Sequence, residues 1–151
     1  MDVLEGLLYI NEQDVYAVYG AFLCEDKKGE HTNYSALLKP PAMKPYTAVD
    51  FREQDGEKLP QTLTPAFEAR EVTLQFALYA TTKANFVQKY MSFVQLLKSG
   101  WLQIYLPELN KIYKMYYVSC TGYTQLTPLD AGTIAGRFAV KFREPVPDLS
   151  F

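Results

Sequence analysis

The sequence predicts a mainly β fold with one α-helix, in which antiparallel strands form a β-sandwich or a partly open barrel and the helix packs on the sheet. Several segments alternate apolar and polar residues, which is the pattern of a half-buried strand. Only one segment, residues 81–100, repeats its apolar residues at helical spacing.

The clearest strand is residues 69–80. One of its faces is apolar, and consists of Val72, Leu74, Phe76 and Leu78. It leads into the helix, which we expect to begin at a Thr82 or Thr81 cap and to end at Gly100. In the helix, the apolar residues are Phe86, Val87, Tyr90, Met91, Phe93, Val94 and Leu97.

The last third of the chain is predicted to hold three strands. Residues 101–106 place Leu102, Ile104 and Leu106 on one face, and a turn at Pro107 to Asn110 leads to a strand over residues 111–120. The closing strand, residues 133–144, has an inward row formed by Ile134, Phe138, Val140 and Phe142. Gly136 falls on this row, which indicates a bulge or close packing there.

The first third is less regular. We expect a strand over residues 7–10, a turn over residues 11–14, and a second strand over residues 15–23 that Gly20 interrupts. Residues 25–65 are polar and contain several prolines, none of which can donate a ladder hydrogen bond. This region is interpreted as two exposed loops around one short strand.

Composition narrows the class of protein. Residues 1–151 fit one domain with its own core, because 48% of the residues are hydrophobic and 21% are charged. The net charge of -2 argues against direct nucleic-acid binding. The acidic N-terminus is unlike a secretory signal and no apolar run is long enough to cross a membrane, so we expect a cytosolic product. Cys24 and Cys120 are then expected to be buried free thiols.

No catalytic, cofactor-binding or metal-binding set is predicted. His31, the single histidine, lies in a polar loop next to Glu25, Asp26 and Glu30, where a solvated side chain is the expected state. Gly132 and Gly136 precede a strand pattern, whereas a phosphate loop precedes a helix, so they are interpreted as part of a hairpin turn.

The aromatic residues are the strongest functional signal, with 12 Tyr and 9 Phe. Tyr113, Tyr116 and Tyr117 cannot all face one core, because neighbours in a strand point to opposite sides. Two interpretations remain: ordinary cross-strand aromatic pairs, or a subunit interface, where Tyr is enriched. The interface interpretation assigns contacts to Tyr9, Tyr16, Tyr19, Tyr113, Tyr116 and Tyr117.

The order of these segments resembles the N-terminal, ring-forming domain of phage distal tail proteins. The matching features are "YINEQDVYAVYGAFL" near the start, Arg70 before the long strand, "GWLQIYLPELNKIYKMYYVSC", and the closing "GRFAVKFREPVP". Glu12 stands where the family usually has glycine in its first turn. The resemblance covers nearly the whole chain.

The resemblance implies a structural subunit of a phage or prophage tail. It would form a ring, expected to be a hexamer, between the tail tube and the baseplate hub proteins, and it would be assembled in the bacterial cytoplasm before joining the virion tail. In such a head-to-tail ring, one patch of each subunit meets a different patch of the next. We place one patch on the N-terminal strands and the other on the tyrosine-rich hairpin.

Three alternatives stay open. The chain could be another tail component, such as a tube or terminator protein. It could be a β-barrel module that binds a small ligand in an aromatic mouth. It could also be an enzyme whose acidic residues, in residues 50–57 or 24–30, converge in space, as the two carboxylates of a glycosidase do.

Overall fold

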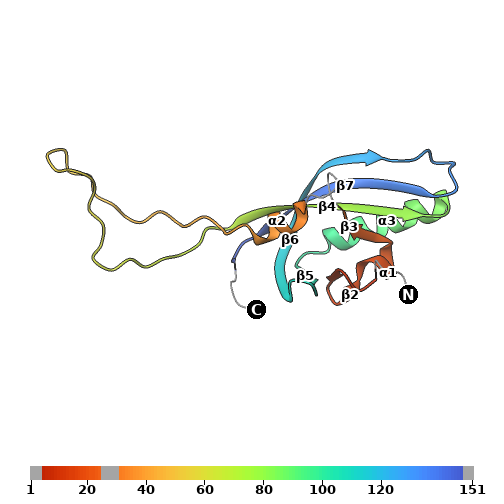
Figure 1. Ribbon diagram of the computed structural model, residues 1–151, viewed down its shortest axis with the longest axis horizontal. Helices are drawn as coiled ribbons and strands as arrows, with labels where there is room; N and C mark the ends of the chain where they lie inside the picture. The colour runs from red at the N-terminus through yellow and green to blue at the C-terminus, as the bar shows by residue number, and fades with distance from the viewer. Residues whose placement is uncertain (1–4, 25–30, 148–151) are drawn as a thin grey trace.

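The computed structural model describes residues 5–24 and 31–147 (Figure 1). In chain order, the elements are β1 (Tyr9–Ile10), β2 (Gln13–Asp14), α1 (Val15–Tyr19), β3 (Ala21–Leu23), α2 (Thr32–Leu38), β4 (Arg70–Ala80), α3 (Lys83–Lys98), β5 (Leu102–Leu106), β6 (Lys111–Gln125) and β7 (Ile134–Glu144). The mainly β prediction is confirmed. To the one expected long helix, α3, the described residues add two short ones.

The strands form one curled antiparallel sheet, a half-barrel, in the order β2-β1-β5-β6-β7-β4-β3. β6 is the central strand, and it pairs with one half of the sheet along its first part and with the other half along the rest. Its residues 111–115 pair with β5, and its residues 116–125 pair with β7. The register shifts between Tyr117 and Ser119 and again between Cys120 and Gly122, and such bulges bend a strand and increase its twist.

The core lies between the two halves of this sheet and α3. Phe93 of α3 packs against Phe76 of β4 and Phe138 of β7, with ring centroids 5.4 Å and 5.8 Å away. β5 and β6 contribute five buried side chains to the core: Leu102, Ile104, Leu106, Tyr113 and Met115. The alternation predicted for β4, β5 and β7 is confirmed, since every apolar residue assigned to their inward rows is buried.

The start of α3 confirms the predicted cap. The Thr82 side chain accepts a hydrogen bond from the Asn85 backbone N–H at 3.2 Å. At the other end, Ser99 caps the helix and Gly100 follows with a φ of +120°, in the region that favours glycine. Gly136 also behaves as predicted: a Cβ there would lie 2.6 Å from the Tyr123 hydroxyl, so close packing excludes a side chain.

The prediction of a strand over residues 15–23 is wrong for its first half. Val15–Tyr19 is a helix, because the Asp14 carboxylate accepts hydrogen bonds from the N–H groups of Tyr16 and Ala17. Gly20 then ends the helix in the left-handed conformation, and only Ala21–Leu23 is extended. What looked like an interrupted strand is a capped helix followed by a short strand.

The expected short strand between two loops is also wrong. Residues 32–38 form α2, which packs against β4. The Asn33 side chain holds the two elements together, since its Oδ1 accepts from Gln75 N at 2.6 Å and its Nδ2 donates to Cys24 O at 2.8 Å. Residues 25–30, with the acidic neighbours of His31, lie outside the described residues.

The cysteine prediction is half right. Cys24 and Cys120 are both free thiols, but Cys24 is only half-buried and Cys120 is exposed on the bulged half of β6. Among the described residues, no helix combines the length and apolar character needed to cross a membrane.

Candidate assembly surface

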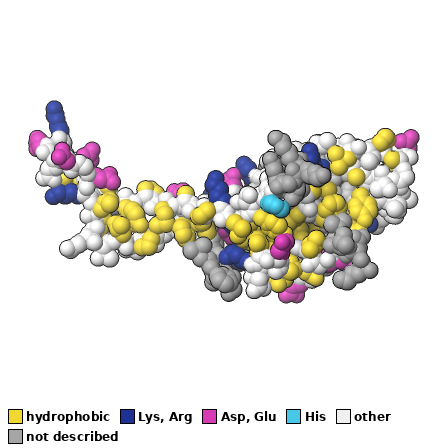
Figure 2. Space-filling model, in the orientation of Figure 1, with side chains coloured by type: hydrophobic (Ala, Val, Ile, Leu, Met, Phe, Trp, Pro, Cys, Tyr) yellow, Lys and Arg dark blue, Asp and Glu magenta, His cyan; other side chains and the backbone are white. Residues whose placement is uncertain are grey.

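A long arm, residues 40–69, leaves the domain between α2 and β4. Figure 1 shows it projecting well beyond the sheet, and Figure 2 shows hydrophobic side chains along it and charged ones near its tip. Its two legs run antiparallel, joined by bridges between Met43 and Phe67 and between Val49 and Lys58. The exposed large apolar side chains of the arm are Met43, Val49, Phe51, Leu59 and Leu63. An exposed apolar surface of this kind is typical of a segment that binds a partner.

The root of the arm is fixed by Arg70, the first residue of β4. Its guanidinium donates to the carbonyl oxygens of Leu37 and Lys39, 3.0 Å and 2.7 Å away, where the chain leaves α2. It also pairs with Glu144, with Nε and Oε1 2.7 Å apart. One side chain therefore holds both ends of the arm against β7, so the arm leaves the domain from a defined point.

A second exposed aromatic surface lies on β5 and β6, on the side away from the core. We call it the outer face and define it by Tyr9, Trp101, Gln103, Tyr105, Ile112, Lys114 and Tyr116. Trp101 and Ile112 are 54% and 59% exposed. The Trp101 ring contacts Tyr116 edge to face at 5.8 Å, and the Lys114 ammonium lies 4.6 Å from its centre. These contacts order large side chains in solvent, as in a binding hot spot.

The six predicted tyrosines separate into three environments. Tyr9 and Tyr116 lie on the outer face, where the Tyr9 ring is 6.0 Å from that of Tyr105. Tyr113 is 1% exposed, so its side chain belongs to the core.

Tyr16, Tyr19 and Tyr117 pack mainly on their own domain. The Tyr16 hydroxyl is hydrogen-bonded to that of Tyr79, and the Tyr19 ring lies 5.7 Å from Phe93 of α3. Tyr117 is partly buried against the core. Tyr9 and Tyr116 are therefore the members of the predicted set that are best placed for an intersubunit contact.

The two predicted patches, on the N-terminal strands and on the tyrosine-rich hairpin, meet at β1. β1 pairs directly with β5, with Tyr9 opposite Tyr105 and Ile10 opposite Ile104. β1 and the hairpin therefore form one continuous surface, whereas β3 lies at the opposite edge of the sheet, beside β4. The sequence pattern could not reveal this, because the pairing joins residues that are more than ninety positions apart.

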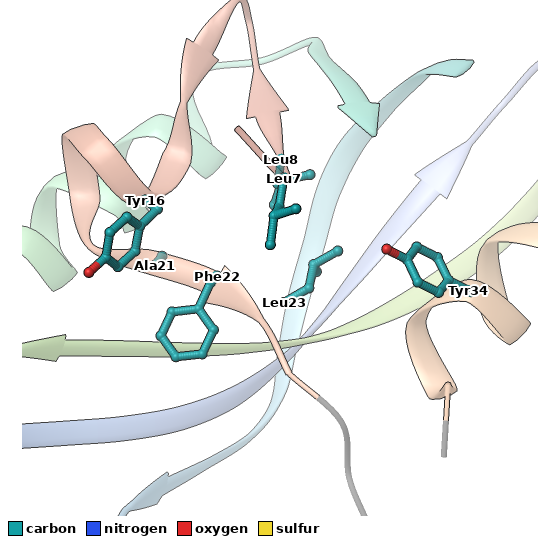
Figure 3. A pocket seen from close by; sticks show the side chains of 7 residues that line it. All are labelled: Leu7, Leu8, Tyr16, Ala21, Phe22, Leu23 and Tyr34. Atoms are coloured by element: carbon teal, nitrogen blue, oxygen red, sulfur yellow. The ribbon is translucent and has the colours of Figure 1, made fainter. Parts of the chain in front are cut away.

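A small pocket lies between α2, β3 and the segment before β1 (Figure 3). It is lined by Leu7, Leu8, Tyr16, Ala21, Phe22, Leu23 and Tyr34. Its volume is about 70 Å³, whereas sites for small organic ligands usually enclose about 300–1,000 Å³. The pocket thus gives no support to the ligand-binding alternative.

Among the residues that the structure describes, no group of three or more His, Cys, Asp and Glu side chains gathers in a way that could hold a metal ion. His31 precedes α2 as its N-cap residue without a side-chain cap hydrogen bond. Gly132 lies in the loop between β6 and β7, and Gly136 lies within β7.

The fold thus defines a class: a curled antiparallel half-barrel with one long helix and a projecting apolar arm. It is similar to the crystal structure of the Dit protein (gp 19.1) of SPP1, which is described as a paradigm of the hub adsorption apparatus in phages that infect Gram-positive bacteria. The TM-score is 0.54 at 14% sequence identity, over 93% of this chain and 52% of the Dit chain. The chain thus spans about half the length of that protein.

Comparisons at the level of sequence gave a different result. No protein-family model and no curated protein matches the sequence. The resemblance to distal tail proteins is therefore carried by the fold, which is shared over almost the whole of this chain.

Proposed function

We propose that the protein is a structural subunit of a phage or prophage tail, and that it assembles into a closed ring between the tail tube and the baseplate hub proteins. The observation that carries this proposal is the shared fold with the SPP1 hub protein over 93% of the chain. Six subunits are expected. Assembly would take place in the bacterial cytoplasm, and the finished ring would belong to the virion tail.

Two features of the described residues support an assembly role. The arm carries apolar side chains into solvent with little contact to its own domain, and the outer face displays ordered aromatic rings. Both features would bury apolar area on association, which is worth roughly 25 cal/mol per Å². The proposed interface residues are Tyr9 and Tyr116, with smaller contributions from Tyr16, Tyr19 and Tyr117.

Electron microscopy of the negatively stained protein tests the proposal. We expect closed rings of uniform diameter with six-fold symmetry. Tyr116→Asp should abolish the rings, because it places a charge beside Trp101 on the outer face, while the circular dichroism spectrum stays that of the folded protein. A Tyr116→Asp variant that forms rings normally would remove Tyr116 from the interface, and an absence of rings in the unsubstituted protein would contradict the proposed function.

A further inference from the structure

A closed ring needs two different contact patches on each subunit. Since β1 and the β5–β6 hairpin form a single surface, the second patch has to come from another part of the chain. Resting on the proposed function, we propose that the arm of one copy lies across the outer face of the next copy. Its apolar side chains would cover Trp101 and Ile112, and its tip would approach Lys114 and Arg143.

Apolar exposure is the first argument. On the arm, Val49 and Phe51 lie close to the tip, and both are about half exposed. On the outer face, Trp101 and Ile112 are the most exposed apolar side chains. The outer face has large apolar side chains on both sides of the Gln103–Lys114 pair, and the arm has them along its legs. Docking the arm on the outer face would bury the apolar side chains of both surfaces.

Charge complementarity is the second argument. The tip of the arm, residues 50–58, carries four acidic and two basic side chains, a net charge of -2. The register places Arg143 beside Tyr116 and Lys141 beside Ser119, which continues the outer face onto β7. Lys114 adds a third positive charge. The one carboxylate among these cations is Glu71, which pairs with Lys141 at 3.0 Å and with Arg143 at 3.2 Å, so the positive charges are in excess. An acidic tip and a basic margin favour one docking orientation.

Reach is the third argument. One leg of the arm has about 15 residues and can span roughly 50 Å when extended, while a domain of this size has a radius of gyration of about 13–15 Å. The arm is thus long enough to cross a neighbouring subunit. Arg70 fixes its root, and in Figure 1 the arm points away from β5 and β6 of its own domain.

Site-specific photo-crosslinking tests the proposal. Phe51 is replaced by benzoylphenylalanine in the full chain, which is mixed with isotopically labelled protein that lacks the probe, so that mass spectrometry separates bonds within a chain from bonds between chains. We expect intermolecular products in peptides that contain Trp101 or residues 111–116. Products within one chain only, or between chains at another surface, would overturn the proposal. A probe at exposed Val87 on α3 is the matched control.

Charge reversal provides a second readout. Lys114→Glu should lower the yield of the Phe51 cross-link several-fold, whereas Lys83→Glu, the same change on exposed α3, should not. Equal yields in the two variants would contradict the docking orientation. The solution mass separates this inference from the proposed function. Ring-sized particles with cross-links elsewhere would overturn only the docking, and a monomer without intermolecular products would overturn both.

Discussion

Arg70 and Glu144 form an ion pair at the point where the arm joins the domain, and their side chains are only 13% and 4% exposed. They face each other because β4 and β7 pair in antiparallel register from Arg70 opposite Glu144 to Ala80 opposite Ile134. The same guanidinium holds the carbonyl oxygens at the end of α2. The pair therefore links the sheet, a helix and the arm.

Removing one partner of this pair should be costly. Arg70→Gln leaves the Glu144 carboxylate buried without a counter-charge, and such changes cost about 3–5 kcal/mol in the free energy of unfolding. Urea denaturation followed by circular dichroism measures the loss. Arg143→Gln is the matched control, because its pair with Glu71 is exposed and screened by solvent, so its loss should cost much less. Equal losses in the two variants would show that the pair does not hold the arm root.

Glu12 offers a stabilising substitution. Asn11 and Glu12 form the two-residue turn between β1 and β2, with φ of +53° and +69°. A side chain at positive φ is strained, and turns of this type favour glycine at the second position. Glu12→Gly should raise the free energy of unfolding by a net amount of roughly 0.5–1 kcal/mol. This net value is smaller than the strain relieved, because glycine also gives the unfolded chain more conformational entropy.

Glu12→Ala is the control for this prediction, because alanine loses the charge but keeps the strain. If alanine stabilises the protein as much as glycine does, the gain comes from removing the carboxylate and the conformational explanation is wrong. The thermal unfolding midpoint of each variant supplies the comparison.

Gly136 should tolerate no side chain while Tyr123 remains. A Cβ would lie 2.6 Å from the Tyr123 hydroxyl and 3.2 Å from the tip of the Phe86 ring. Gly136→Ala is expected to lower the free energy of unfolding by roughly 1–3 kcal/mol, the usual cost of overpacking. In a Tyr123→Ala background the same change should cost less, because the main clash is gone. A cost that is independent of Tyr123 would contradict the packing described. Gly132→Ala, with open space around it, should be nearly neutral.

Tyr34 makes stability depend on alkaline pH. Burial, together with the hydrogen bond and the charge of Glu108, raises the pKa of Tyr34 from 10.0 to about 12. Between these values the folded state keeps a proton that the unfolded state releases, so the contribution is complete below pH 10 and is lost as the pH rises through about 12. Stability should thus fall less steeply with pH in Tyr34→Phe than in the unsubstituted protein. Denaturant titrations between pH 9 and pH 11 measure both slopes, and identical slopes would contradict the assignment.

Much of the fold could be predicted because strand periodicity is local. The alternation in β4, β5 and β7 and the cap of α3 depend on neighbours in sequence, and all were confirmed. The prediction for Val15–Tyr19 is wrong because its aromatic and branched residues also suit a strand. The helix forms because Asp14 caps its start and Gly20 caps its end.

The candidate surface was less predictable because it depends on contacts between distant segments. The sequence showed that Tyr113, Tyr116 and Tyr117 cannot all face one core, but the direction of each depends on how β6 pairs with β5 and β7. The position of the arm could not be predicted either. Its root is set by Arg70 and Glu144, which are 74 residues apart in the chain.

The solution mass tests the central claim most directly. Light scattering coupled to size exclusion, over a range of protein concentrations, should give a species of about six times the chain mass of 17.3 kDa. Its mass should not grow further with concentration, because a closed ring has no free ends. A protein that remains monomeric at all concentrations, or one whose mass grows without limit, would contradict the ring.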